Sequence, residues 1–396
     1  MDPLTVDASQ RSTDGPLQGT VVADFSRVLA GPYATMLLAD LGATVVKVEA
    51  PQGDDTRHWG PPWTSAGDST YFLSVNRNKR SVVLDLNDAR DKRRATALIR
   101  RSDVVVQNLR PASLQRLGLD YEAVRSSNPA LVYCSITGFG SAGGADLPGY
   151  DLVVQAVSGL MSLTGPDEET PTKTGIATAD VLTGLHAALG ILAALHHRQR
   201  TGEGQLVEVN LMSSMLSGLV NFGGAYALTG NVARGMGIRH EGICPYEPFA
   251  TKDRRLVVAA ANDGLFRTLC DCLDLPAVKT DPRFATNADR VAHRDELCEL
   301  LAAVLVGRTA GEWFEMLTEA GVPCGPINDV AQGMDLAGSL GLEPIVDVEG
   351  SAQVAHPVRM SRTPASYRYA PPDLGSDQEE ILGWLDAEIR DERELS

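Results

Sequence analysis

A single carboxylate at the start of a long apolar segment is the group best suited to chemistry in this chain. Asp180 follows a loop of small residues, TKTGIATA at 172–179, and precedes the apolar run at 181–199. Thr178 is predicted to cap a helix here, which places Asp180 in the first turn, where free N–H groups favour an ionised carboxylate. Such a carboxylate is able to attack a thioester and form a mixed anhydride. The alternative is that Asp180 only stabilises the helix end, because aspartate is common in first turns.

Other side chains that commonly catalyse reactions lack the neighbours that they need. None of the serines at 135, 141, 158 and 162 lies in the G-x-S-x-G sequence of a serine hydrolase. The histidines are isolated or lie on an apolar segment, and the six cysteines show no zinc-binding spacing. We therefore predict no metal site and expect the cysteines to be free, buried thiols.

The composition limits the class of ligand. The chain has 396 residues and a net charge of −16, which argues against a general nucleic-acid binder, because such proteins carry a surplus of Lys and Arg. An anionic ligand must then meet a local group of basic residues. The first predicted strand is followed by SRVLAG instead of the dinucleotide fingerprint G-x-G-x-x-G, and no P-loop sequence is present. The motifs that usually indicate binding of nicotinamide, flavin or P-loop nucleotides are therefore missing. We predict no permanently bound cofactor.

Strand-like and helix-like segments alternate through the first 140 residues. Short β-rich runs stand at 20–25, 43–50, 81–86, 103–108 and 131–140, with helical segments between them. This alternation predicts an α/β fold with an open, Rossmann-like parallel sheet in a large domain. After the glycine-rich stretch 231–242, two β-runs and several helices predict a smaller α+β domain. We assign 17–230 to the large domain, 231–335 to the small domain, and 336–396 to a C-terminal segment that returns to the large domain.

Three apolar segments, at 152–163, 181–199 and 212–230, are predicted to be buried helices, because apolar residues cover most of their surfaces. The last is expected to break at Gly223 and Gly224. No uninterrupted apolar run reaches about 18 residues, and the first 16 residues lack the apolar core of a signal peptide. We expect a cytoplasmic protein in which residues 1 to about 16 lie outside the fold.

Basic and amide side chains follow the predicted parallel strands. In open α/β sheets, ligands bind beyond the carboxyl ends of the strands, and the loops there carry Arg27, Arg57, Asn108 and Arg110. Taken together, these residues predict a site for an anionic ligand. Taken one at a time, each is also compatible with an ordinary solvated loop residue.

The chain resembles the class III coenzyme A transferases, the family of formyl-CoA transferase and carnitine CoA-transferase, which also contains α-methylacyl-CoA racemase. The resemblance rests on several motifs in combination and covers nearly the whole chain from about Gly19. The motifs are DFSRVLAGPYATMLLADLGATVVKVEAPQGDDTR from 24, NRNKRSVVLDL at 76–86, QNLRPASLQRLGLDYE at 107–122, SITGFG at 135–140, GYDLVVQAVSGLMSLTG at 149–165, TADVLTGLHAALGILAAL at 178–195, PYEPFATKD at 245–253 and AGVPCGPIND at 320–329.

The resemblance implies a role for Asp180. In this family the matching aspartate forms an acyl anhydride and then an aspartyl-CoA thioester, while CoA is moved from an acyl-CoA donor to a carboxylic acid acceptor. It also implies a homodimer of two interlocked chains and acyl-CoA bound as a substrate in the large domain. With the strand-end residues, the candidate CoA-binding positions are Arg27, Val28, Ala30, Arg57, Lys79, Arg80, Asn108, Arg110, Arg116, Tyr150 and Asp151.

The racemase branch of the family is the main alternative. Racemases of this family resemble this chain but have a histidine where Tyr150 stands, and a glutamate near the position of Asn262. A tyrosine, with its usual pKa near 10, is a poor base at neutral pH. The sequence therefore favours a transferase, with a racemase-like epimerase and a non-catalytic CoA-binding protein as alternatives. The donor and the acceptor are not specified by these residues.

Overall fold

The computed structural model describes residues 15–395, and its side chains except those at 388 and 390–395. Most of the segment expected to lie outside the fold, residues 1–14, falls outside the described residues. Gly15 belongs to the fold, because it is buried and an added Cβ would lie 2.3 Å from the backbone oxygen of Leu41. The chain forms two compact units. Unit 1 runs to Leu160, from Thr174 to Asn231, and from Glu343 onward; unit 2 comprises Met161–Lys173 and Val232–Leu342.

Unit 1 is built on a six-stranded sheet in which every pairing is parallel. The strand order is β3-β2-β1-β4-β5-β6. Strands β2 and β3 are therefore added on one side of β1, and β4, β5 and β6 on its other side. This confirms the predicted α/β fold with a parallel sheet. The strands are β1 (Val21–Asp24), β2 (Thr44–Glu49), β3 (Lys79–Val83), β4 (Val104–Gln107), β5 (Val132–Thr137) and β6 (Gln205–Asn210).

Helices cover both faces of this sheet, which explains why its strands are almost continuously apolar. Successive residues of a strand point to opposite faces, and Val22 and Ala23 accordingly belong to two different core clusters. The first cluster includes α1 (Ala30–Asp40) and α8 (Thr178–Thr201), and the second includes α3 (Ala89–Arg101) and α17 (Gln378–Leu395). Both faces are therefore packed.

The other elements of unit 1 lie in the connections and near the chain's end. They are η2 (Asp55–His58), α2 (Thr70–Leu73), α4 (Pro111–Leu117), α5 (Tyr121–Val124), α6 (Asp151–Val157), α7 (Leu160–Leu163), α9 (Leu211–Gly218), α10 (Val220–Thr229), β10 (Ile345–Val348) and β11 (Ser351–Val354). Of these, α7 extends into the part of the chain that is assigned to unit 2.

Unit 2 combines a small antiparallel sheet with helices around its own apolar core. Its strands β7 (Tyr246–Ala250), β8 (Arg255–Ala259) and β9 (Cys324–Pro326) pair in the order β7-β8-β9. Phe249, Phe266 and Trp313 belong to the core. The helices are α11 (Asp263–Cys272), α12 (Pro276–Thr280), η3 (Pro282–Phe284), α13 (Asn287–Ala292), α14 (Arg294–Leu305), α15 (Ala310–Glu319) and α16 (Val330–Ser339).

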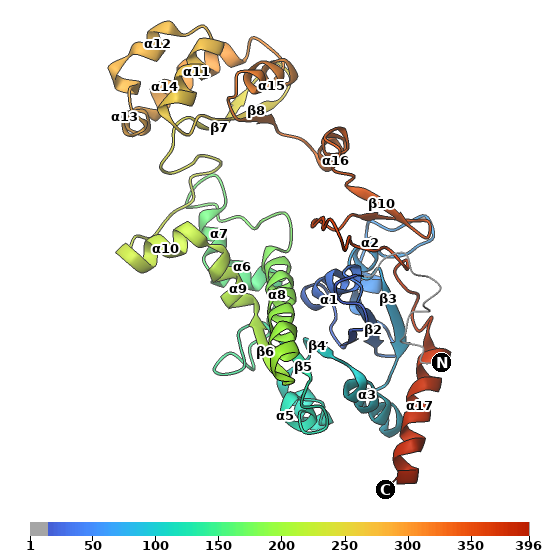
Figure 1. Cartoon of the computed structure of the whole chain (residues 1–396). Coiled ribbons are helices and arrows are strands. Elements are labelled where there is room, and N and C mark those ends of the chain that lie inside the picture. Colours follow the sequence, from blue (N-terminus) through green and yellow to red (C-terminus); the bar gives the residue numbers. More distant parts are fainter. Residues whose placement is uncertain (1–14, 396) are drawn as a thin grey trace. The chain divides into compact units, whose positions relative to one another are not determined.

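The end of the chain packs on unit 1. Figure 1 shows α17 beside α3, and the two helices are joined by Arg94, whose guanidinium donates to both carboxylate oxygens of Asp386 at 2.8 and 2.7 Å. Upstream, buried Asp40 accepts from Arg77 at 3.0 and 2.6 Å and from Asn78 at 2.7 Å. Asn78 in turn accepts from two backbone N–H groups of the returning segment, at 368 and 369. A buried polar network thus fastens the last part of the chain to α1.

Two predictions about the apolar segments are wrong. The segment 152–163 is divided into α6 and α7 at Gly159, and the segment 212–230 breaks at Leu219, whereas Gly223 and Gly224 lie inside α10. Nor are these helices buried throughout, because Leu189 of α8 is 65% exposed and Leu228 of α10 is 86% exposed. These helices carry apolar residues on more of their surface than the rest of this chain buries.

Helix α8 is long and apolar enough, by length and composition alone, to cross a membrane, since an 18-residue window in it has a mean hydropathy of 1.5. In unit 1, however, Ala187 and Ile191 of α8 are fully buried in the cluster that covers one face of the sheet. A core helix passes the same test of composition, so this property gives weak evidence for a membrane span.

Candidate active site

The N-terminus of α8 presents Asp180, and a carboxylate from another helix caps it. The prediction that Thr178 caps α8 is wrong, because the helix begins at Thr178 and Ala177 precedes it without a side-chain hydrogen bond. Asp151, at the start of α6, accepts instead from the backbone N–H groups of Ala179 at 2.8 Å and of Asp180 at 3.4 Å. The free donors of the helix end are thereby satisfied, and Asp180 is not needed for capping.

Gln155 connects this cap to the loop before α8. Its side-chain amide donates to Asp151 at 2.6 Å and to the carbonyl of Ile176 at 3.3 Å. Its amide oxygen accepts from the backbone N–H of Thr174 at 3.0 Å. Gln155 is almost fully buried, so the small-residue loop in front of Asp180 is held in one arrangement.

The surroundings of Asp180 disfavour its charge. Burial raises the pKa of Asp180 to about 7, and the nearby carboxylate of Asp151 adds to the effect. The same carboxylates act on Tyr71 of α2: burial, and then the charges of Asp180, Asp151 and Asp54, raise the pKa of its phenol to about 12. Tyr71 therefore stays neutral and able to donate a hydrogen bond. Asp180 is poised to change its charge near neutral pH.

Close packing brings helix α8, one turn after Asp180, against the start of α1. Gly184 lies one turn after Asp180, and an added Cβ there would lie 2.7 Å from the backbone oxygen of Ala30. Only glycine permits this approach of α8 to the start of α1. The carboxylate and the loop of residues 27–30 are consequently held at neighbouring helix ends.

The loop itself is fixed from both sides. The side chain of Asn108, after β4, accepts from the N–H of Arg27 at 3.0 Å and donates to the carbonyl of Arg27 at 2.7 Å. The carboxylate of Asp54 accepts from the N–H of Val28 at 3.2 and 3.3 Å. Val28 has a φ of 69°, which is uncommon for a β-branched residue and persists only where the surroundings enforce it.

Buried charge pairs support this loop from below. Lys47 pairs with Asp54 at 2.9 Å, with both side chains 1% exposed, and donates to the carbonyl of Ser26 at 3.1 Å. Burial works against the charge of each partner, yet their attraction keeps the pKa of Asp54 below and that of Lys47 above the ordinary values. The pair therefore remains ionised and positions the Asp54 carboxylate under Val28.

The other basic residues predicted to bind CoA occupy different environments. Lys79 is fully buried, where burial lowers its pKa to about 8, and it donates to Asp24, to Asn76 and to the carbonyl of Pro32. Its three donors are all used inside the protein. Arg80 faces α17 and pairs with Asp377 at 2.9 Å and with Glu380. Neither cation is directed toward the loop of residues 27–30 by these contacts.

Three arginines of the prediction differ in their partners. Arg57 donates to both oxygens of Glu49, at 2.8 and 2.7 Å, and stacks over Phe72. Arg110 precedes α4 and Arg116 lies in its last turn. Both are exposed, and neither forms an ion pair with a residue that the structure describes. They remain accessible for an anion.

Of the remaining predicted positions, some lie at helix starts and one lies on the surface. Ala30 begins α1, Asp151 begins α6, and Tyr150 precedes α6 with 62% of its surface exposed. Arg27 is half-exposed and lies 3.4 Å from Asp55. The structure brings together Asp151 and the backbone of Asp180, Gly184 of the same helix and Ala30, and Asn108 and Arg27.

Comparison with known proteins decides the family. The model of CoA-transferase family III matches residues 17–378. A succinate–glutarate CoA-transferase of Agrobacterium fabrum is 40% identical over 386 residues, which cover 94% of this chain and 96% of the relative. The human succinyl-CoA:glutarate CoA-transferase is 40% identical over 374 residues, which cover 93% of this chain and 85% of the relative.

This chain belongs to CoA-transferase family III. It is an enzyme of the CoA-transferase type, which removes the non-catalytic alternative. A crystal structure of a CAIB/BAIF family protein from Brucella suis has the same fold, with a TM-score of 0.87 and 37% identity over 95% of this chain and 100% of that protein.

Sequence reasoning about this family III transferase missed Tyr71, Asp54 and Gln155. Asp54 stands in the quoted motif APQGDDTR, where a run of two acidic residues between strand and arginine is a visible signal. Tyr71 and Gln155 carry no such signal, because each becomes informative only through the carboxylates that the fold places near it.

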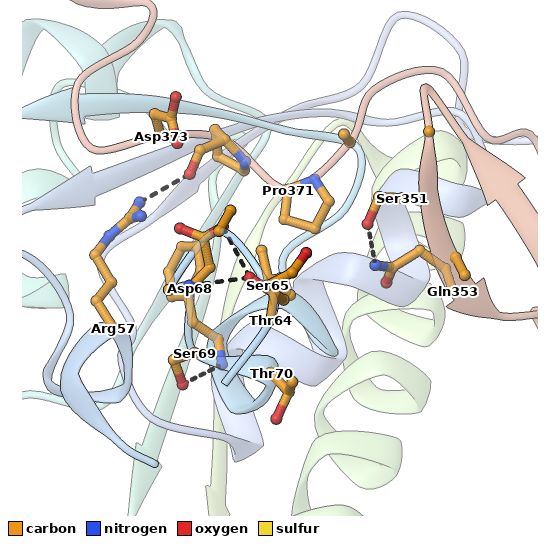
Figure 2. A pocket seen from close by; sticks show the side chains of 18 residues that line it. Arg57, Thr64, Ser65, Asp68, Ser69, Thr70, Ser351, Gln353, Pro371 and Asp373 are labelled. Carbon is orange, nitrogen blue, oxygen red and sulfur yellow. Dashed lines mark hydrogen bonds between the residues drawn. The ribbon is translucent and has the colours of Figure 1, made fainter. Parts of the chain in front are cut away.

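A cavity of about 590 Å³ lies in unit 1 of the transferase, and Asp180 is not among the residues that line it. Residues 64–70, 72 and 73 and the returning residues 350–353 and 370–373 line it, together with Arg57. Figure 2 shows that Arg57 points to the chain beside Asp373, where it donates to the carbonyl of Pro372 at 3.0 Å. Since Arg57 is also committed to Glu49, we assign no ligand to this cavity.

Proposed function

We propose that this enzyme moves CoA from an acyl-CoA donor to a carboxylic acid acceptor through covalent intermediates on Asp180. One observation carries the proposal: Asp180 stands at the start of α8, one turn before Gly184 meets Ala30, and its helix end is already capped by Asp151. A carboxylate that is not needed for capping is available as a nucleophile.

The proposed series of reaction steps needs no metal, water or redox partner. The Asp180 carboxylate attacks the thioester carbon, which gives a mixed anhydride and the CoA thiolate. The thiolate attacks the Asp180 carbonyl, which releases the donor acid and leaves an aspartyl-CoA thioester. The acceptor carboxylate then attacks this thioester to form a second anhydride and free the thiolate again. Attack of the thiolate on the acceptor's acyl carbon gives the new acyl-CoA and restores Asp180.

We propose succinyl-CoA as the donor and a short dicarboxylic acid as the acceptor. The names of the two relatives, each 40% identical over most of this chain, support this substrate class. A panel of succinyl-, acetyl- and formyl-CoA against mono- and dicarboxylic acids tests it by following each new acyl-CoA. Transfer to dicarboxylates is expected, whereas α-proton exchange of a 2-methylacyl-CoA without an added acid would instead indicate the racemase activity.

CoA is proposed to bind at the loop of residues 27–30, with the exposed Arg110 and Arg116 as candidate phosphate partners. Asn108 tests this, because its side chain holds both backbone groups of Arg27. We expect Asn108→Ala to raise the KM for acyl-CoA about 10-fold and to change kcat little, since two hydrogen bonds together contribute about 1–3 kcal/mol. Initial rates measure this, with Asn231→Ala as a control; an unchanged KM would place CoA elsewhere.

The pH dependence of transfer follows from the surroundings of Asp180. Only the ionised carboxylate attacks the thioester, and its pKa is raised to about 7. The value of kcat/KM is therefore expected to rise with pH and to level off above about 7. Asp151→Asn should move the midpoint to lower pH, because it removes the nearby negative charge while keeping an acceptor for the N–H of Ala179. A midpoint near 4 in the native enzyme would contradict this prediction.

We also propose that the enzyme is a homodimer. Large apolar side chains on α6, α8, α9 and α10 are exposed in the single chain, among them Val157, Leu189 and Leu228 at 55, 65 and 86%. Exposed apolar surface of this extent is typical of a subunit interface. Interlocking of the two chains is the arrangement that the family resemblance implies.

A further inference from the structure

Two buried cysteines and a glutamate form a cluster in unit 2 that the transfer reaction does not use. Cys244 precedes β7, Glu247 lies on β7, and Cys298 lies on α14. Their sulfur and carboxylate atoms all lie within 4.8 Å of one another, and the Cys298 thiol donates to Glu247 at 3.0 Å. All three residues are buried, and Cys244 is 0% exposed.

Arginines surround this cluster. Arg239 Nε lies 3.1 Å from one oxygen of Glu247, and Arg294 Nη1 lies 3.5 Å from the other. Arg294 Nη1 is buried and makes no hydrogen bond with any residue that the structure describes, whereas Nη2 of the same guanidinium donates to the carbonyls of His240 and Ile243. The anion that Arg294 Nη1 faces is therefore the Glu247 carboxylate, which also accepts from Cys298.

The two thiols are not equivalent. The adjacent Cys298 thiol lowers the pKa of Cys244 in spite of burial, and the positive charge of Arg294 contributes to this. The Cys298 thiol donates a hydrogen bond to Glu247, and the neighbouring Cys244, followed by burial and Glu247, raises the pKa of Cys298. Cys244 is therefore the thiol that ionises first, and Cys298 keeps its proton. A nucleophilic thiolate beside a protonated partner thiol is the arrangement of reactive cysteine pairs.

A metal ion fits this cluster less well than thiol chemistry does. Structural zinc sites have four ligands, and this cluster offers three. The guanidinium groups of Arg239 and Arg294 also contact the glutamate that would have to bind the cation. The two positive charges next to the carboxylate repel a divalent cation and so disfavour its binding at this cluster.

We propose that Cys244 and Cys298 are a dithiol pair that a hydroperoxide oxidises to a reversible disulfide. The Cys244 thiolate attacks the peroxide oxygen, the O–O bond breaks, and the sulfenic acid forms with release of water or an alcohol. The Cys298 sulfur then attacks the Cys244 sulfur, its proton leaves with the sulfenic hydroxyl as water, and the disulfide forms. Two thiols are oxidised by two electrons, and the peroxide is reduced by two.

A cavity lies beside the glutamate of the cluster. Glu247 and Arg239, which contact the cluster or each other, line a cavity of about 570 Å³ in unit 2. A small oxidant that enters the cavity meets the Glu247 carboxylate, which also contacts Cys298 and Arg294. Closure of the disulfide would also remove the hydrogen bond from Cys298 to Glu247, so that the carboxylate would rely on its arginine partners alone.

Peptide mapping of the full-length protein tests the pair. The protein is treated with a small molar excess of hydrogen peroxide, alkylated with N-ethylmaleimide, digested and analysed by mass spectrometry. We expect a linked peptide that joins Cys244 to Cys298 and that disappears with dithiothreitol. In Cys298→Ser, dimedone should label Cys244 instead. Cys324→Ser is the matched control, because Cys324 is a half-buried thiol that is not a member of the cluster, and it should leave the linked peptide unchanged.

Two results would overturn this inference. One is oxidation of Cys272 or Cys324, the two less buried cysteines, before any linkage of Cys244 to Cys298. The other is about one equivalent of zinc in the purified protein that is lost in Cys298→Ser, which would make the cluster a metal site. Neither readout depends on transfer activity, so the outcome is separate from that of the proposed function.

Discussion

Asp180→Ala is expected to lower the transfer rate at least about 10⁴-fold, because removing a covalent nucleophile leaves only binding and orientation to act on the substrate. The backbone of α8 should be unaffected, since Asp151 and not Asp180 caps the helix. Rates with succinyl-CoA and a dicarboxylic acid measure the effect. Asp146→Ala is a matched control, because Asp146 is an exposed aspartate in the loop before α6, and it should keep full activity.

The same variant has a second readout in covalent chemistry. An aspartyl anhydride or thioester is cleaved by hydroxylamine, which leaves a hydroxamate on the residue that carried it. We expect this label on Asp180 during turnover of the native enzyme and none in Asp180→Ala. Label on another carboxylate, or full transfer by Asp180→Ala, would refute the assignment.

Asp180→Ala is also expected to be more stable than the native protein at alkaline pH. The pKa of Asp180 in the folded protein is raised to about 7 from 3.8, so its carboxyl group opposes folding increasingly as the pH rises above 3.8, and fully above about 7. Removing the carboxylate should therefore stabilise the protein by up to about 4 kcal/mol at pH 8, and the gain should vanish near pH 4. Thermal unfolding at the two pH values tests this, and a gain that is independent of pH would contradict it.

Asp40→Ala is expected to lower the free energy of unfolding of unit 1 by about 3–5 kcal/mol, because it leaves the buried guanidinium of Arg77 without its counter-charge. Asp40 is 0% exposed and accepts three hydrogen bonds from Arg77 and Asn78. The returning segment should loosen as well, since Asn78 holds the backbone at 368 and 369. Urea denaturation measures the loss, and limited proteolysis reports on the segment.

Two further variants define the cause of that loss. Asp55→Ala removes a surface pair with Arg27, in which both side chains are about half exposed, and should cost less than about 1 kcal/mol. Asp40→Leu with Arg77→Met replaces the buried pair by apolar side chains and should recover much of the stability of native unit 1. If the double variant is as unstable as Asp40→Ala, shape and not charge explains the effect.

The sheet could be predicted because its signals are local. Runs such as TVVKVE and VVVQ are apolar and β-branched, and short helical segments separate them, which leaves few topologies besides a parallel sheet. Helix breaks were harder to predict. The chain breaks at Leu219 and continues as a helix through Gly223 and Gly224, because glycine permits a break without requiring one.

Burial and hydrogen-bond partners decided the basic residues of the candidate site. Lys79 and Arg80 are neighbours in the sequence, yet Lys79 is buried against Asp24 and Arg80 pairs with carboxylates at the start of α17. Their partners are 55 and 297 residues away along the chain. A local pattern carries no information on such distant partners. The sequence therefore showed that these residues are charged, but not which residues they pair with.

The sequence by itself determined the α/β class, the family resemblance and the choice of Asp180, because these depend on periodicity and on motifs that each lie within one stretch of chain. Only the tertiary structure decided what surrounds Asp180. Asp151 reaches it from 29 residues away to cap its helix, Gly184 allows α8 to meet α1, and burial raises its pKa to about 7. Electrostatic environment and close backbone packing are properties of the assembled fold, and the order of residues along the chain does not contain them directly.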